Sequence, residues 1–300
     1  NRGLVSRPFF PRPVRAMVEP LLESQADLLL DAIDEQQEVD LVTAFARPYP
    51  FKIITRLLGI PVHDDDKCLE WALKIIDFPW DPEGALKAKA EFDDYLLPLI
   101  ARRREKPEED VISVLASAEL EEQKLDDEEI LSFCRLLFPA GSDTTYKNLG
   151  SLLYALLSDP GLREMAQLGD TQREAIVQEG LRWEAPTALL PRMCSKDTQL
   201  GGVDIHDGDW VLFGITAANN DPGVFPDPRV FDPARDNKNL AFGHGEHFCL
   251  GSHLARRELE CAIERVMARF PGMSLMADRP VTLSQAVLRG PESLWVRPHG

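Results

Sequence analysis

The segment Phe-Gly-His-Gly-Glu-His-Phe-Cys-Leu-Gly at 242–251 contains the residue types that a metal-ligating thiolate needs. Such a sulfur must stay deprotonated in a tight loop, best placed just before a helix whose positive N-terminal end faces it. Gly243 and Gly251 permit sharp turns and close approach to a flat cofactor. Cys249 precedes an apolar helical pattern at 250–269, so its position suits that chemistry.

The cysteine loop alone leaves two other interpretations open. A glycine-rich turn with one buried cysteine before a helix would have the same composition. Zinc is a weaker alternative, because His244 and His247 are near Cys249 but no second cysteine completes a usual zinc-ligand spacing.

Residues 140–145 read Ala-Gly-Ser-Asp-Thr-Thr and fall in the middle of a long helical pattern over 126–157. Pro139 lacks an amide donor, so we expect it to weaken the helix and deepen a kink there. In one interpretation the hydroxyls simply bond back to the preceding turn. In the other, the segment is a pocket for dioxygen, where Thr144 could hydrogen-bond the oxygen and Asp143 could relay protons from solvent.

Several such motifs occur in one order along the chain, which is far more specific than any of them alone. The pattern Phe-x-x-Gly-x-x-x-Cys-x-Gly resembles the haem-binding loop of the cytochromes P450, with Cys249 as the iron ligand. The pattern Ala-Gly-x-Asp-Thr resembles the oxygen-binding helix of the same family. The resemblance covers essentially the whole chain and is to the soluble bacterial type. It implies a mainly α fold with a minor β part, as a single domain over 1–300 that is incomplete at the N-terminus, where the first strands and helices are missing.

The resemblance implies haem b, iron protoporphyrin IX, as the cofactor. Buried haem carboxylates need cationic or hydrogen-bonding partners, and Arg2, Arg192 and His247 match that role. The remaining positions expected to contact the haem are Phe242, Gly243, Gly251, Ala140 and Gly141.

Glu179 and Arg182 are three residues apart and therefore share a helix face. By themselves they indicate little. In the resemblance they form a buried ion pair that Arg235 joins from an irregular, Pro- and Asp-rich segment at 219–240. We assign these three residues to folding and haem retention.

Six apolar residues are expected to line the substrate pocket, although each could equally belong to the core. They are Leu136, Pro139, Ala188, Leu189, Val287 and Leu288.

Composition excludes some classes of function. The 33 Lys and Arg against 50 Asp and Glu give a net charge of −17, which argues against nucleic-acid binding. No run approaches the roughly 18 apolar residues of a membrane span, and no secretory leader is visible. Five cysteines without close pairs suit the reducing cytoplasm.

The positioning elements follow from apolar periodicity and from Gly and Pro stop signals. We expect short strands at 187–216 and a hairpin or two in the tail at 273–298. Helices are expected at 13–36, 39–58, 64–77, 83–105, 126–157, 171–184 and 250–269.

The predicted activity is that of a haem-thiolate monooxygenase, which inserts one oxygen atom of O2 into a small hydrophobic organic substrate. A ferredoxin-type donor with its NAD(P)H reductase would supply electrons, and Arg2, Arg256 and Arg257 could form a basic patch for it. One alternative is a peroxide-using or non-redox thiolate-haem enzyme. Another is a non-catalytic haem- or ligand-binding fragment.

Overall fold

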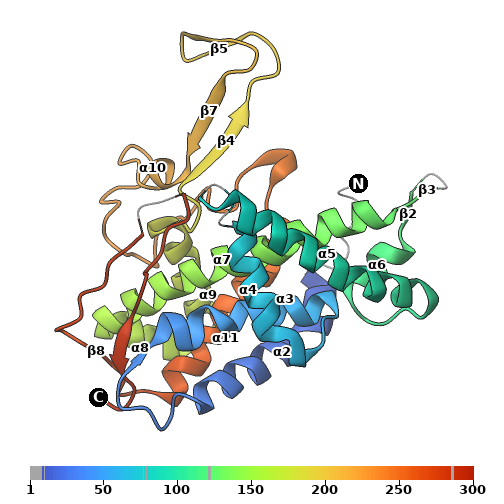
Figure 1. Ribbon diagram of the computed structural model, residues 1–300. Helices are drawn as coiled ribbons and strands as arrows, with labels where there is room; N and C mark the ends of the chain where they lie inside the picture. Colours follow the sequence, from blue (N-terminus) through green and yellow to red (C-terminus); the bar gives the residue numbers. More distant parts are fainter. Residues whose placement is uncertain (1–8, 10, 77, 79, 121–122, 285–286) are drawn as a thin grey trace.

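The longest described helix, α7 (Asp127–Ser158), begins where the sequence offers a complete N-terminal cap. The Asp126 side chain accepts a hydrogen bond from the Glu129 amide, and the Glu129 carboxylate accepts one from the Asp126 amide. In the computed structural model, which describes residues 9, 11–76, 78, 80–120, 123–284 and 287–300, α7 runs through the centre of the helical body (Figure 1).

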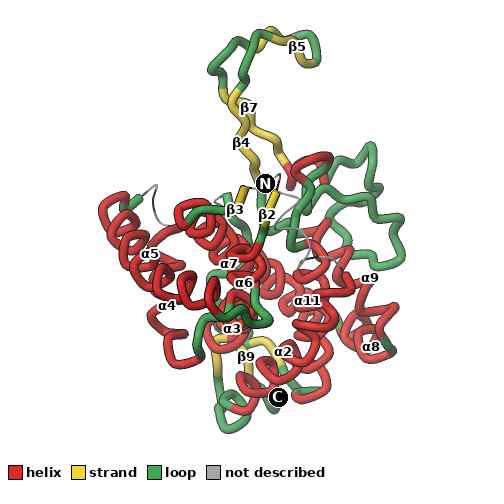
Figure 2. Tube along the Cα trace, turned by 90° about the vertical axis from the view of Figure 1, so that its right-hand side faces the viewer, coloured by secondary structure: helices red, strands yellow, loops and turns green. Residues whose placement is uncertain are grey.

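Helices make up most of this body, and the strands form small antiparallel sheets, which confirms the predicted fold class (Figures 1 and 2). The other helices are α2 (Pro11–Asp31), α3 (Pro48–Leu58), α4 (Asp65–Ile76), α5 (Pro82–Glu105), α6 (Val111–Ser117), α8 (Pro160–Leu168), α9 (Asp170–Trp183), α10 (Ile215–Asn219) and α11 (Ser252–Arg269). The strands are β1 (Val39–Asp40), β2 (Glu119–Leu120), β3 (Gln123–Lys124), β4 (Leu189–Met193), β5 (Thr198–Leu200), β6 (Val203–Ile205), β7 (Trp210–Gly214), β8 (Ser274–Leu275) and β9 (Trp295–Arg297). Within the described residues, no helix is long and apolar enough to cross a membrane.

The expected long helix at 126–157 is confirmed, because the backbone is helical throughout Asp127–Ser158. The kink expected at Pro139 stays a prediction. Pro139 removes one amide donor without ending the helix. Hydroxyls after it donate to carbonyls of the preceding turn, from Ser142 to Phe138 at 3.1 Å and from Thr145 to Gly141 at 3.3 Å. Packing of α7 against the helices around it keeps this weak segment helical.

A series of ion pairs attaches α11 to α2. Arg257 pairs with Glu19, Arg265 pairs with Asp27 and Arg269 pairs with Asp31. The members are partly exposed, and such pairs contribute only about 0–1 kcal/mol each. Their spacing along both helices nevertheless fixes the register of α11, the helix that follows the cysteine loop.

The expected helix at 39–58 begins instead with strand β1, which pairs with β9 near the other end of the chain. The Asp40 carboxylate accepts hydrogen bonds from the amides of Val42 and Leu294, at 3.1 and 2.7 Å. A π-helical turn, η2 (Val42–Ala46), follows before α3 begins. This pairing over a long sequence separation cannot be seen in local periodicity.

Strands β4 and β7 form the two-stranded ribbon that projects from the helical body, with β5 and β6 at its tip (Figures 1 and 2). The predicted β character of 187–216 is therefore confirmed. In the tail, β8 pairs with β9, and β9 pairs with β1 on its other side.

Two short helices, α6 and α8, were not anticipated from the sequence. Asp110 caps α6 by accepting from the Ser113 amide at 2.7 Å. Asp159 caps α8 in the same way, with Pro160 in the first turn. An aspartate before a proline is a readable start signal, but both helices are too short for a periodicity to stand out.

Gly290 provides a test of how closely the C-terminal segment packs on α7. A Cβ at Gly290 would stand 2.7 Å from the backbone oxygen of Lys147. We expect Gly290→Ala to lower the free energy of unfolding by about 1–3 kcal/mol, because backbone atoms cannot move aside cheaply. Gly214→Ala is the control, since its nearest atom would be the Ala217 Cβ at 3.4 Å. Equal urea midpoints for the two variants would contradict this packing.

Candidate functional site

A largely apolar cavity of about 590 Å³ lies between α7 and the cysteine loop. Many of the residues proposed from sequence line it. These are Leu136, Ala140, Gly141 and Thr144 from α7, Arg192 from β4, and Phe242, Gly243, His247, Cys249 and Gly251 from the loop.

The cysteine loop is a chain of tight turns. The amide of Cys249 donates to the Phe242 carbonyl at 2.9 Å, and Gly243 has a φ of +72°, which favours glycine. Cys249 is half-buried, three residues before α11 begins at Ser252. A Cβ added at Gly251 would meet no atom within 4 Å, so the cavity wall is open at that point. This surface suits a flat cofactor.

Arg256 is an additional residue near the sulfur. Its guanidinium carbon lies 4.6 Å from the centre of the Phe242 ring. Burial lowers the pKa of Arg256, while the negative charges of Glu260 and then of a Cys249 thiolate oppose that shift, so the guanidinium lies within electrostatic reach of the sulfur. The signal in the sequence is its place in the first turns of the helix that follows Cys249, since Arg256 is the fifth residue of α11. The sequence alone indicates a role for Arg256 only in a basic surface patch.

The two residues of the Asp143–Thr144 pair lie in different surroundings, Thr144 at the cavity and Asp143 in a buried charged cluster. Thr144 lines the cavity, and its hydroxyl donates to the Ala140 carbonyl at 2.9 Å. Asp143 is buried beside Tyr146 and Lys147 and is not among the described residues of the cavity wall. Burial and the Asp143 charge raise the pKa of Tyr146 to about 12. Burial lowers the pKa of Lys147, and the Asp143 charge opposes that shift.

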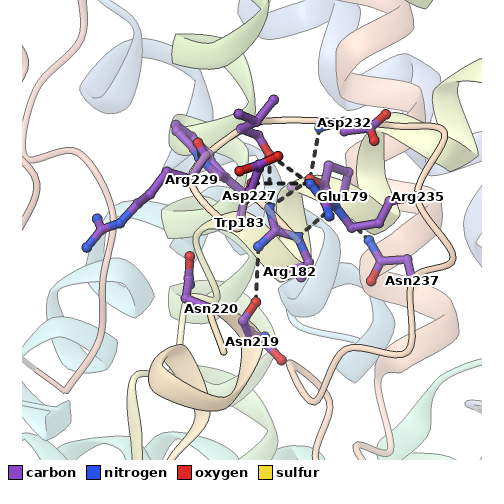
Figure 3. Close-up of polar contacts among 12 residues, drawn as sticks. Glu179, Arg182, Trp183, Asn219, Asn220, Asp227, Arg229, Asp232, Arg235 and Asn237 are labelled. Atoms are coloured by element: carbon purple, nitrogen blue, oxygen red, sulfur yellow. Dashed lines mark hydrogen bonds and ion pairs between the residues drawn. The ribbon is translucent and has the colours of Figure 1, made fainter. Parts of the chain in front are cut away.

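The structure brings Glu179, Arg182 and Arg235 together behind the site (Figure 3). Arg182 and Glu179 are both 0% exposed and form a bidentate pair, with N–O distances of 2.8 and 2.7 Å. The Arg235 Nε atom lies 3.5 Å from the Glu179 carboxylate. The cluster therefore contains two cations around one carboxylate.

Backbone and amide groups of the irregular segment 219–240 complete this cluster (Figure 3). Arg182 donates to the carbonyls of Asn219 and Val230, at 3.0 and 3.2 Å. The Glu179 carboxylate accepts from the Asp232 amide and from the Asn237 side chain, each at 2.9 Å. The pair thus holds the segment that leads directly into the cysteine loop.

The proposed substrate positions are only partly on the cavity wall. Leu136 and Ala140 line it, whereas Pro139, Ala188, Leu189, Val287 and Leu288 are not among its described lining residues. Thr187 and Leu190 line it instead. Side chains on a strand alternate between faces, so Leu190, two residues before Arg192, shares its face, and Leu189 does not. That alternation was available in the sequence. Contact of any of these residues with a substrate stays a prediction.

The polar groups on the wall fit the carboxylates of a haem. Arg192 donates to the Pro191 carbonyl at 2.8 Å and has no carboxylate partner within the described part of the chain. His247 is exposed on the loop. Arg2, the third residue assigned to this role, lies outside the described residues. A thiol at a helix entrance, a flat apolar wall and an unpaired cation together match the donor set that haem requires.

Comparison with known proteins identifies the family. Residues 62–168 and 173–293 match the family model described as Cytochrome P450. Polyketide biosynthesis cytochrome P450 PksS of Bacillus subtilis is 35% identical over 298 residues, which cover 98% of this chain and 73% of that protein. The 6-deoxyerythronolide B hydroxylase of Saccharopolyspora erythraea is 35% identical over 306 residues, 100% of this chain and 75% of that enzyme.

Solved structures agree with this assignment. The structure of PksS superposes with a TM-score of 0.93 at 35% identity, covering 100% of this chain and 78% of that one. CYP109E1 from Bacillus megaterium, in complex with testosterone, gives a TM-score of 0.92 at 30% identity, covering 100% and 83%. The chain belongs to the cytochrome P450 family of haem-iron monooxygenases. The predicted family and enzyme class are thereby confirmed.

The Glu179 cluster generates a stability prediction. Glu179→Gln removes the negative charge and leaves the buried Arg182 and the partly buried Arg235 without their carboxylate partner. We expect the free energy of unfolding to fall by about 3–5 kcal/mol, with parallel loss of haem during gel filtration. Asp170→Asn is the matched control, because its pair with Arg173 is also i,i+3 but Asp170 is exposed. A Glu179→Gln protein as stable as that control would contradict the assigned role.

Proposed function

We propose that this P450 inserts one oxygen atom of O2 into a small hydrophobic organic substrate, with haem b as cofactor and electrons from a separate redox partner. The observation that carries the proposal is the shared cavity. Cys249, before α11, and the α7 segment Ala140–Thr144 line the same space. Haem supplies the oxygen-activating chemistry when bound, and thiolate ligation favours O–O cleavage.

The residues around Cys249 favour its thiolate form. The positive N-terminal end of α11 and the Arg256 guanidinium both stabilise negative charge on the sulfur. Phe242 lines the cavity beneath Arg256 and limits access of water to the sulfur. Arg192 and His247, with Arg2 by resemblance, would hold the carboxylates of the haem. Gly243 and Gly251 would let the loop backbone approach it closely.

Thr144 and Asp143 would deliver protons to the oxygen side of the cavity. Thr144 lines the cavity, and its hydroxyl, which donates to the Ala140 carbonyl, has oxygen lone pairs that can accept a hydrogen bond from a proton donor in the cavity. Asp143, one residue earlier and beside Lys147, would supply further protons to Thr144 from the buried charged cluster. A relay of this kind is needed because cleavage of O–O consumes protons.

An apolar wall supports a hydrophobic substrate. Leu136, Leu190 and Phe213 are among its lining side chains. The relatives point the same way: CYP109E1 was solved with testosterone, and another relative is named for 6-deoxyerythronolide B. Apolar pockets with few polar groups bind such ligands by burying their surface.

A ferredoxin-type protein with its NAD(P)H reductase is the proposed electron donor, in the cytoplasm, which the cysteine usage also suits. The basic patch suggested for docking is smaller than expected. Arg257 already pairs with Glu19 and Glu260, and Arg256 stacks on Phe242. Both are therefore committed to the fold, and we assign neither a main role in docking.

Substitution of Thr144 tests the oxygen relay. With surrogate ferredoxin partners, Thr144→Ala should consume NAD(P)H at the wild-type rate. The product formed per NAD(P)H should fall by about tenfold, because without the hydroxyl more of the electrons end in hydrogen peroxide. Ser142→Ala is the matched control, since Ser142 also bonds back to the preceding turn but is not among the lining residues. Unchanged coupling in Thr144→Ala, or wild-type product formation that requires peroxide and ignores NAD(P)H, would refute the proposal.

A further inference from the structure

A series of contacting aromatic rings leads away from the cavity wall into the pair of helices α4 and α5. It starts at Phe138 of α7, which follows Leu137 directly and lies three residues before Gly141. Both of those neighbours line the cavity. The Phe138 ring stacks on Phe92 of α5, with ring centres 4.9 Å apart. The Phe92 ring centre lies 5.8 Å from that of Trp71 on α4.

The series ends at Tyr95, which lies three residues after Phe92 on α5. The ring centres of Tyr95 and Trp71 are 5.4 Å apart. Centre distances of about 4.5–7 Å are those of rings in contact, so Phe138, Phe92, Trp71 and Tyr95 form a continuous ring path. The first three are at most 2% exposed, whereas Tyr95 is partly exposed. The ring path therefore connects the cavity wall with a residue that solvent can reach.

The two easily oxidised side chains of the ring path each donate a hydrogen bond to a carboxylate. The Tyr95 hydroxyl donates to the Asp64 carboxylate at 2.6 Å, and the Trp71 indole donates to Glu91 at 2.9 Å. A phenol gives up its proton when it gives up an electron, so a carboxylate in contact makes that oxidation easier. The Asp64 side chain is 24% exposed and lies 3.4 Å from the exposed His63, so a proton accepted there can leave to solvent.

The charges around the ring path favour Tyr95 over Trp71 as the oxidised residue. The Lys67 ammonium lies 4.7 Å from the centre of the Trp71 ring and disfavours positive charge on it. Burial and then the hydrogen bond to Asp64 raise the pKa of Tyr95, so the phenol keeps its proton until an electron leaves. Transfer of that proton to Asp64 leaves a neutral tyrosyl radical, which needs no counter-charge.

We propose that the ring path protects the haem site. When the haem has been oxidised and no substrate takes the oxygen atom, one electron moves from Tyr95 along the ring path to the haem, and the phenol proton moves to Asp64. The proposal rests on the proposed monooxygenase function. It adds to that function a way to end the side reactions that an active site must prevent.

The cycle balances with a small thiol in solution as the reductant. The thiol gives a hydrogen atom to the Tyr95 radical, and Asp64 releases its proton to water. Two such transfers return both electrons that the haem lacks. The oxygen atom then leaves as water with two protons from solvent, and the two thiols become one disulfide.

Electron paramagnetic resonance of the haem-loaded protein tests the ring path directly. The ferric protein, without substrate, is mixed with peracetic acid and frozen at once. The wild type should give a tyrosyl radical whose hyperfine splitting collapses when the tyrosines carry deuterated rings. Tyr95→Phe should lose this signal, whereas Trp80→Phe, at an exposed indole outside the ring path, should keep it. A wild type without the radical, or a Tyr95→Phe variant that retains it, overturns the proposal.

The route between the rings is tested by a matched pair of variants. Phe92→Leu removes the ring between Trp71 and Phe138 and should lose most of the radical signal. Phe51→Leu is the control, because the Phe51 ring also contacts Phe138, at 5.3 Å, but lies outside the ring path. Both variants remove a buried phenylalanine ring from the same cluster, so loss of packing affects them alike. Equal signals in the two variants would overturn the route.

The protective role and the proposed function fail in different ways. A Soret band that peracetic acid leaves unchanged would refute the proposed function, and the protection with it. A Soret band that changes without a Tyr95-dependent radical would refute the ring path alone. With redox partners and NAD(P)H but no substrate, Tyr95→Phe should bleach its haem several-fold faster than the wild type. Equal bleaching would overturn the protective role.

Discussion

The bidentate pair between Glu179 and Arg182 is the constraint on which the geometry of the site depends. Both charges are fully buried, so each oxygen and N–H must find a partner. Most of these partners are backbone groups of the irregular segment 219–240. Backbone hydrogen bonds within turns shape that segment locally, and the buried charges attach it to α9. It ends at Leu240, whose amide donates to the Asn219 side chain, two residues before Phe242.

This constraint fixes one wall of the cavity, and the contact between α7 and α11 fixes the other. The ion pairs with α2 set the register of α11 and thereby the position of the helix end near Cys249. Apolar side chains predominate among the described lining residues of the cavity, and two of its polar groups lie where we propose that charge changes during the reaction. The sulfur lies near Arg256, and Thr144 lies beside the buried Asp143. An apolar surrounding strengthens each of these electrostatic effects.

The short motifs could be predicted from the sequence because the spacing of their residues along the chain determines how the side chains are arranged in space. The cysteine loop and the i,i+3 pair need only local chain conformation to bring their groups together. The pairing of β1 with β9 joins segments near opposite ends of the described chain, and local periodicity in the sequence did not reveal it. Glu258, on α11, shows the same limit: a glutamate is normally exposed, yet Glu258 is 1% exposed, and its own helix does not reveal this.

The carbon monoxide difference spectrum of the reduced, haem-loaded protein tests the central claim, that Cys249 ligates the haem iron through its sulfur. The account predicts the strongly red-shifted Soret band of a thiolate haem in the wild type. It predicts loss of that band in Cys249→Ser, while Cys194→Ser, at a half-buried cysteine away from the cavity, retains it. A wild type without this band, or a Cys249→Ser variant that keeps it, would contradict the account.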